Sequence, residues 1–222
     1  MNIEVKHIKK AYGKKQVLQD ISLTANGGEC IGILGSNGCG KSTLLSILAG
    51  VQKADSGTFL CDGADLFLNP RRRETLVGYV PQGTPLIEEL SAWDNLRLWY
   101  EKGALEKSLE DGVLATLGVS EFLRVPVFKM SGGMRKRLSI GCAMAKQPPV
   151  LLLDEPTAAL DLVCKARIAD YLRSFREKGG ILLMTTHDVQ ELSLCDRHYI
   201  MRDGVLERFQ YTGNVQELVC KL

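Results

Sequence analysis

Wholly apolar runs of four or five residues alternate along this chain with segments of helical periodicity. The runs at 30–34, 150–153 and 181–184 carry no charged or hydroxyl side chain, a pattern typical of strands buried on both faces of a parallel sheet. Helical segments are expected at 44–49 and 161–178, each after one of these runs and a connecting loop. The alternation predicts an α/β fold built around a mostly parallel sheet.

Shorter strand patterns occupy the N-terminal part of the chain. Residues 2–9 and 16–25 predict two strands joined by a turn at 11–15, and residues 58–61 and 76–80 predict two more. Sequential strands joined by short turns pair in antiparallel fashion. We therefore expect an N-terminal antiparallel β sub-domain beside the parallel sheet.

The pattern becomes helical in the middle of the chain. Helical spacing runs from Ser91 to about Leu117, with Ser91 as an N-cap, and another helix is expected after Ser131. This organisation predicts a core at about 1–83 and 148–210, with an inserted α-helical sub-domain at about 84–147.

The tail predicts a β-hairpin followed by a helix. The hairpin strands fall at 199–201 and 205–209, around the turn residues Asp203 and Gly204. A short C-terminal helix is expected at about 212–222. All 222 residues then form a single domain.

Composition narrows the classes of protein to which the chain can belong. Its 45% hydrophobic and 24% charged residues are ordinary for a globular protein, and its net charge of +2 argues against a dedicated nucleic-acid binder. Its apolar runs are far shorter than the ~20 residues of a membrane span. The seven cysteines include no C-x-x-C pair, which fits reduced thiols better than a zinc site or a disulfide framework.

The first chemical pattern follows the apolar run at 30–34. Its loop fits the P-loop pattern G-x-x-x-x-G-K-[ST], and a strand before it and a helix after it argue against a chance glycine-rich turn. Such loops bind phosphate through converging backbone N–H groups and the positive end of the helix dipole. We expect Lys41 to reach the β- and γ-phosphates and Ser42 to bind Mg²⁺. The residues expected at the nucleotide are Gly35, Ser36, Asn37, Gly38, Cys39, Gly40, Lys41, Ser42 and Thr43.

Two carboxylates, Asp154 and Glu155, end the buried run at 150–153. Parallel strands end at the same edge of a sheet, so both carboxylates should lie beside the P-loop. Asp154 can hold Mg²⁺, directly or through water, and Glu155 can act as a general base on the attacking water. Without the P-loop, the pair would indicate only a solvated loop.

A third pattern, Met-Ser-Gly-Gly-Met at 130–134, lies about 90 positions after Lys41. Here the sequence resembles the nucleotide-binding domain of ABC transporters, over about residues 2–210. The family signature is usually written L-S-G-G-Q, and here Met130 replaces its Leu and Met134 its Gln. The resemblance implies a P-loop NTPase core in which Ser131, Gly132 and Gly133 contact the γ-phosphate of ATP held by a second, head-to-tail subunit.

Four further residues match motifs of that family, and the resemblance implies their roles. Tyr12 would stack on adenine, Gln82 would contact Mg²⁺ or the attacking water, Asp161 would belong to the D-loop, and His187 would contact the γ-phosphate. Taken alone, Tyr12 indicates a surface turn, Gln82 a polar loop residue and His187 a helix cap.

The resemblance implies an ATP-binding and ATP-hydrolysing subunit that powers a separate transmembrane permease. Such a subunit is cytoplasmic, lies on the inner face of the cell membrane through that partner, and forms a homo- or heterodimer with a second ATP-binding subunit; no nucleic acid is expected. The signature followed by basic residues resembles the drug-resistance and ABCA-like branch, which favours export. The run at 135–137 otherwise indicates the solvated face of a helix.

Two alternatives remain open. A soluble ABC-type ATPase acting on DNA would need a long coiled-coil insertion, which the gap between P-loop and signature does not contain, and ribosomal members usually carry two such domains. A P-loop kinase of small molecules would have no use for the signature.

Two expectations concern surfaces and reactivity. The segment at 86–100 is richer in apolar residues than a small helical sub-domain needs, so part of it should be exposed, in the groove that takes a coupling helix in the resembled family. Cys39 lies inside the P-loop, so its alkylation should block nucleotide binding and MgATP should protect it.

Overall fold

A six-stranded sheet runs through the centre of the computed structural model, which describes residues 1–211 and 213. The strand order is β10-β9-β3-β8-β7-β6; only β10 is antiparallel to its neighbour. The predicted α/β fold and its mostly parallel sheet are therefore confirmed. The strands are β3 (Cys30–Leu34), β6 (Val77–Val80), β7 (Val150–Asp154), β8 (Ile181–Thr185), β9 (Arg197–Arg202) and β10 (Val205–Phe209).

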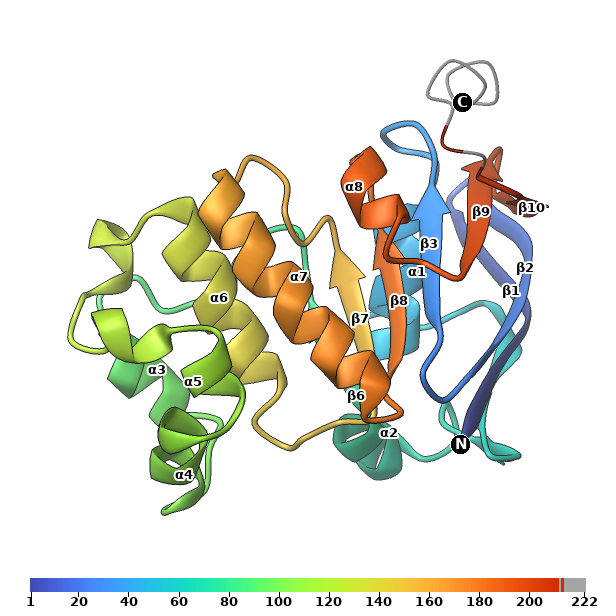
Figure 1. Ribbon diagram of the computed structural model, residues 1–222. Helices are drawn as coiled ribbons and strands as arrows, with labels where there is room; N and C mark the ends of the chain where they lie inside the picture. The colour runs from blue at the N-terminus through green and yellow to red at the C-terminus, as the bar shows by residue number, and fades with distance from the viewer. Residues whose placement is uncertain (212, 214–222) are drawn as a thin grey trace.

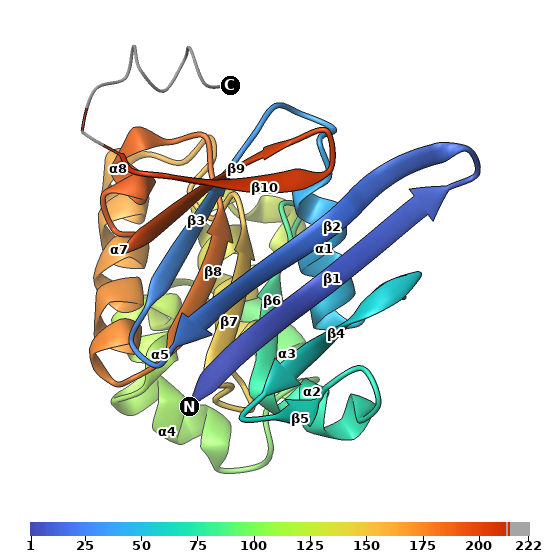
Figure 2. The same ribbon diagram turned by 90° about the vertical axis from the view of Figure 1, so that its right-hand side faces the viewer.

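A second, antiparallel sheet has the order β2-β1-β4-β5 and confirms the predicted N-terminal β sub-domain. Figure 2 shows its two long strands crossing in front of α1 (Lys41–Ala49). Its strands are β1 (Asn2–Tyr12), β2 (Lys15–Asn26), β4 (Ser56–Cys61) and β5 (Ala64–Asp65).

Alternating side chains of the central strands build two cores. Val150 and Leu152 pack with the helix α1 and the antiparallel sheet. Leu151 and Leu153 point to the opposite face and pack with α7 (Leu162–Glu177). Each fully buried leucine contributes roughly 2 kcal/mol through loss of apolar surface to water. This two-sided burial fixes β7 and β8, and therefore the residues that follow them.

Short helices between β6 and β7 gather beyond one edge of the sheet (Figure 1). Ser91 caps the first of them by accepting a 3.2 Å hydrogen bond from the Asp94 N–H, as predicted. The stretch predicted as helical from Ser91 to about Leu117 consists of three short helices, because Gly103 adopts a left-handed φ of 86° and Gly112 an extended conformation. The elements are α3 (Ala92–Arg97), α4 (Ala104–Glu110), α5 (Val113–Thr116), η1 (Val119–Phe122), η2 (Val127–Lys129) and α6 (Gly132–Ala143).

The prediction of a solvated face at 135–137 is also wrong. Lys136 and Arg137 are 5% and 6% exposed. Arg137 Nη1 donates to the carbonyl oxygens of Leu117 at 2.8 Å and Gly118 at 3.3 Å, and its guanidinium lies 4.9 Å from the Phe122 ring centroid. These partners lie about twenty residues upstream, so the local charge pattern could not indicate them.

Two more helices complete the described chain, α2 (Pro70–Leu76) and α8 (Val189–Leu192). The C-terminal hairpin of β9 and β10 forms as predicted, whereas the helix expected at 212–222 falls outside the described residues. None of the helices in the described part combines the length and the apolarity that a membrane span requires.

Candidate nucleotide site

The predicted P-loop joins the buried strand β3 to the helix α1. Gly40 precedes the helix with a φ of 114°, which an L side chain rarely adopts, and a Cβ there would lie only 2.9 Å from Leu18 on β2. The loop residues 36–38 are exposed. The N–H groups in the first turn of α1, which have no partner within the helix, therefore lie beside an exposed loop. An anion can reach them there.

Lys41 lies against the inner side of this loop and is 6% exposed. Its Nζ donates to the carbonyl oxygens of Gly35 at 2.7 Å and Ser36 at 3.1 Å. These two bonds hold the ammonium group within the curve of the loop, where it can attract phosphate oxygens. The neighbouring Ser42 is exposed, so its hydroxyl is accessible.

The two predicted carboxylates occupy the end of β7. Asp154 is 2% exposed and pairs in register with Thr185 of β8, whose hydroxyl donates to Asp154 Oδ1 at 2.5 Å. Glu155 follows with a φ of 47°, and its N–H donates to the Thr185 carbonyl oxygen at 3.1 Å. A positive φ costs free energy in a glutamate, and the hydrogen bonds to Thr185 hold the backbone in this conformation.

Two of the predicted catalytic residues, Gln82 and His187, contact the third, Glu155. Gln82 Nε2, just after β6, donates to Glu155 Oε2 at 3.0 Å. His187 Nε2, just after β8, lies 3.0 Å from Glu155 Oε1. Since a carboxylate only accepts hydrogen bonds, the proton between these two side chains belongs to His187 Nε2. The loops after β6 and β8 thus each place one side chain against the carboxylate that follows β7.

The segment that follows His187 is anchored through Glu191 of α8. This carboxylate is 6% exposed; its Oε1 accepts from the Thr157 N–H at 3.0 Å, and its Oε2 accepts from the Thr186 hydroxyl. Burial raises the pKa of Glu191. The two bonds tie the residue before His187 to the turn that follows Glu155.

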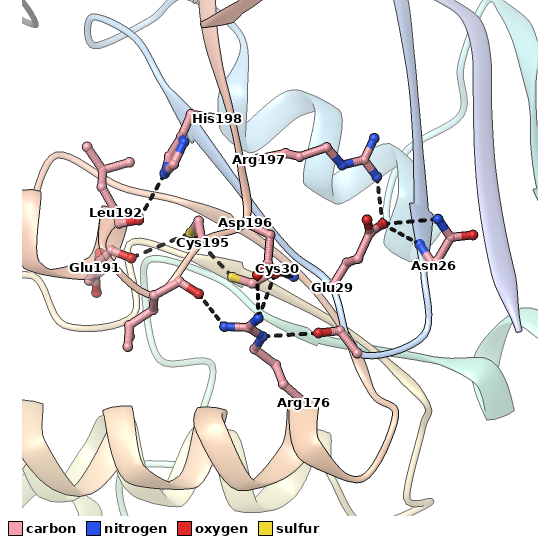
Figure 3. Close-up of polar contacts among 12 residues, drawn as sticks. Asn26, Glu29, Cys30, Arg176, Glu191, Leu192, Cys195, Asp196, Arg197 and His198 are labelled. Atoms are coloured by element: carbon pink, nitrogen blue, oxygen red, sulfur yellow. Dashed lines mark hydrogen bonds and ion pairs between the residues drawn. The ribbon is translucent and has the colours of Figure 1, made fainter. Parts of the chain in front are cut away.

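Farther along, Arg176 of α7 fixes the same segment to the base of the sheet (Figure 3). Its Nη1 donates to the Leu194 carbonyl oxygen at 2.5 Å and its Nη2 to the Asp196 carboxylate at 2.6 Å. Beside it, Cys30 Sγ lies 3.3 Å from Cys195 Sγ, and both thiols are buried. The segment from His187 to β9 is therefore held at both ends.

The signature residues form the start of α6, as predicted. Ser131 is its N-cap, and its Oγ accepts from the Met134 N–H at 3.2 Å. Ser131 and Gly132 are exposed, whereas Gly133 is buried. Gly133 packs so closely against α7 that a Cβ on it would overlap Cys164 Sγ. The exposed helix start offers backbone donors to an anion outside this subunit.

Comparison with known families decides the class of this domain. A family model described as ABC transporter matches residues 18–158, well over half of the chain. The chain belongs to the ABC transporter family. Its domain is an ATP-binding ATPase cassette of that family.

Curated relatives of this cassette include proteins named for export and for import. It is 36% identical to Nod factor export ATP-binding protein I of Sinorhizobium fredii (91% of this chain, 60% of that protein). It is 38% identical to sulfate/thiosulfate import ATP-binding protein CysA 1 of Chromobacterium violaceum (94% and 61%) and 34% identical to lipopolysaccharide export system ATP-binding protein LptB of Escherichia coli (92% and 88%). The cassette thus spans about 60% of the length of two of these three relatives.

Solved structures agree with the fold. An ATP-binding subunit of an ABC transporter matches with a TM-score of 0.87 at 25% identity, over 100% of this chain and 99% of that one. The ATP-binding cassette MJ0796, solved as a dimer in a post-hydrolysis state bound to ADP and Pi, matches with a TM-score of 0.81 at 29% identity, over 93% and 97%.

Two predicted site residues make other contacts in the cassette. Tyr12 is 48% exposed, and its hydroxyl donates to Gln52. Gln52 follows the C-terminal end of α1, whereas the P-loop precedes the N-terminal end of that helix. Asp161 caps α7 by accepting from the Cys164 N–H at 2.9 Å, and this bond lowers the pKa of Asp161. Their nucleotide contacts remain predictions.

Three residues of the cassette's site were absent from the sequence prediction. Thr185 and Glu191 organise the two carboxylates and the His187 segment, and Lys136 contacts the backbone at Gln82. Thr185 could have been predicted from the sequence, since it is the polar residue that ends a buried strand at the same edge of the sheet as Asp154. Lys136 carried none, because its partners come from a distant loop.

A groove of about 410 Å³ lies between the core and the helical region of the cassette. Its lining includes Leu86, Tyr79 and Trp99, and Trp99 is 57% exposed. Ile87 and Leu98 are 46% and 59% exposed. The expectation that part of the segment at 86–100 is exposed apolar surface is confirmed.

Proposed function

We propose that this cassette is the nucleotide-binding subunit of an ABC transporter, in which ATP binding joins two cassettes and Glu155 serves as the base for hydrolysis. The observation that carries the proposal is the convergence of Gln82 and His187 on the two oxygens of Glu155. A carboxylate held in this way beside a P-loop is suited to take a proton from water.

Different residues of the site bind the phosphates and activate the attacking water. Lys41 and the P-loop N–H groups bind the phosphates and offset their charge. Glu155 accepts the proton of the attacking water, while Gln82 and His187 fix the direction in which its carboxylate points. The family resemblance also implies that His187 lies next to the γ-phosphate.

The donor atoms at this site fit Mg²⁺. The exposed Ser42 hydroxyl and the Asp154 carboxylate are hard oxygen donors, and Gln82 keeps its carbonyl oxygen because its Nε2 serves Glu155. Within the described residues, no group of three or more His, Cys, Asp and Glu could hold a metal alone; Mg²⁺ commonly completes its shell with water and phosphate. When bound, Mg²⁺ neutralises phosphate charge.

A second cassette would complete the site. Ser131 and Gly132 present an anion seat to the outside, and Leu162 and Val163 at the start of α7 are 76% and 66% exposed. An exposed apolar pair beside Asp161 fits a contact made only in a dimer. The dimeric cassette among the similar structures supports the same arrangement.

A membrane-embedded permease subunit is the partner proposed for the groove near Trp99, with the cassette on the cytoplasmic face of the membrane. Exposed apolar side chains there suit an amphipathic helix. We infer export as the direction, supported by the Ser-Gly-Gly-Met signature and the following basic residues. Three of the relatives carry export or resistance in their names: Nod factor export ATP-binding protein I, lipopolysaccharide export system ATP-binding protein LptB, and linearmycin resistance ATP-binding protein LnrL of Bacillus subtilis.

Light scattering on the Glu155→Gln variant tests the dimer. With MgATP, the measured molar mass of this variant should be twice that of the chain, because ATP joins two cassettes and is not hydrolysed. The Lys41→Ala control should stay monomeric at the same ATP concentration. A monomeric Glu155→Gln variant that binds ATP would contradict the composite site.

Purification from the source cells separates the two classes of function. A co-purifying integral membrane protein supports the transporter subunit. Recovery of ribosomal RNA or DNA without a membrane protein would favour the soluble ABC-type ATPase instead.

A further inference from the structure

Lys136 lies on α6, five positions after the signature residue Ser131, and is 5% exposed. Its Nζ donates to the carbonyl oxygens of Pro81 and Gln82, both at 3.1 Å. A buried lysine is rare unless its charge is paired or fully hydrogen-bonded. Here, the ammonium group is hydrogen-bonded to the backbone of the loop that carries Gln82.

The surroundings of this ammonium group belong to the catalytic site. Burial lowers the pKa of Lys136, and the carboxylates of Asp154, Glu191 and Glu155 act in the opposite direction. Gln82, whose backbone Lys136 contacts, donates through its side chain to Glu155.

We propose that Lys136 is a positioning residue for ATP hydrolysis: its ammonium group fixes the backbone at Pro81 and Gln82, so that the Gln82 amide stays on the carboxylate of Glu155. The inference rests on the proposed role of Glu155 as the base. Ser131 caps the same helix, so the Lys136 contact also links the signature end of α6 to Glu155, the proposed general base of the same subunit.

The neighbouring basic residues serve other purposes, which isolates the effect of Lys136. Arg137 joins α6 to the helical region through Leu117 and Gly118. Arg135 forms a partly exposed ion pair of 3.2 Å with Glu88, of the kind that contributes little to stability. Loss of the Lys136 amine should therefore leave α6 packed while it frees the loop.

Steady-state ATPase kinetics of Lys136→Met test the proposal. We expect kcat to fall on the order of tenfold, since a hydrogen bond from a charged group is lost, with the KM for ATP within about twofold because the P-loop is untouched. Lys136→Arg should recover most of the rate, since a guanidinium can donate to both carbonyl oxygens. Lys107→Met, at an exposed position on α4, is the matched control and should keep the parent kinetics.

A double-mutant cycle with Gln82→Ala tells positioning apart from general damage to the fold. If Lys136 acts through Gln82, Lys136→Met should slow the Gln82→Ala variant by less than about twofold. The same tenfold loss in both backgrounds, or an unchanged kcat in Lys136→Met, would overturn the proposal. Should Lys136→Met fail to fold, the cycle is run with Lys136→Gln and judged by the same outcomes. Undiminished turnover in Glu155→Gln would instead defeat the proposed function itself.

Discussion

His187 Nε2 and Glu155 Oε1 lie 3.0 Å apart, although their residues follow two different strands, β8 and β7. The pair exists because β7 and β8 are parallel neighbours that end at the same edge. Replacement of His187 by Ala removes one of the two groups that direct the carboxylate. We expect turnover to fall about 10- to 100-fold, with ATP affinity little changed.

His7 provides the control for that variant. It lies on β1, is exposed, and pairs with Asp20 at 2.9 Å. His7→Ala should hydrolyse ATP at the parent rate in the same assay. Equal losses in the two variants would mean that the His187 effect is not one of catalysis.

Gly133 should be intolerant of a side chain, because an added Cβ would overlap Cys164 Sγ and push α6 away from α7. We expect Gly133→Ala to lower the free energy of unfolding by about 1–3 kcal/mol, the usual effect of overpacking. Urea denaturation at 25 °C measures it.

Gly132→Ala is the matched control for this packing argument. A Cβ at Gly132 would meet Leu160 Cδ2 at an ordinary 3.7 Å, so its stability should match the parent. Adding Cys164→Ala to Gly133→Ala should recover part of the loss. No recovery would show that the overlap with the sulfur is not the cause.

Asp161 should stabilise the chain as a helix cap in a pH-dependent way. The Cys164 N–H lowers the pKa of Asp161 in the folded state, so the stabilisation is present above the ordinary pKa of 3.8 and is lost as pH falls through the lowered folded value. Asp161→Ala should therefore melt below the parent at pH 7, and the gap should narrow by pH 3. A gap of equal size at both pH values would contradict this assignment.

Cys39 should be the thiol through which alkylation stops nucleotide binding. Among the cysteines that the structure describes, it is the only one that is not buried, and its Sγ would lie 2.6 Å from a Cβ on Gly35. A group added to the sulfur would therefore distort the loop. N-ethylmaleimide should abolish ATP binding, and MgATP should slow the reaction.

The Cys39→Ala variant decides whether that thiol is responsible. It should bind ATP and keep this binding after the same treatment. Loss of binding in treated Cys39→Ala would assign the effect to another residue.

The sequence predicted those parts of the site that depend on short-range rules. A buried strand, a glycine-rich loop and a helix start fix the P-loop locally, and a strand end fixes Asp154 and Glu155. Parallel strands then bring Gln82 and His187 to the same edge. What stayed hidden depends on partners far away in the chain. Lys136 reaches carbonyl oxygens 54 and 55 positions upstream, which no charge pattern reveals.

The fold shows the same division. The strands at 30–34, 150–153 and 181–184 were predictable because burial on both faces excludes charged residues from the whole run. The helical character of the stretch from Ser91 is predictable from its apolar spacing, but this spacing does not show where one helix ends and the next begins. Gly103 ends the first part of this stretch with a left-handed φ of 86° and precedes α4, where its N–H donates to Glu106 Oε2 at 3.1 Å.

The most direct test of the account is the steady-state ATPase rate of Glu155→Gln, measured beside its affinity for ATP. The substitution keeps the size of the side chain and removes the base. We predict that turnover falls at least about 100-fold while the affinity stays within about threefold, since the P-loop binds the phosphates. Turnover equal to that of the parent would contradict the assignment of Glu155 as the catalytic base.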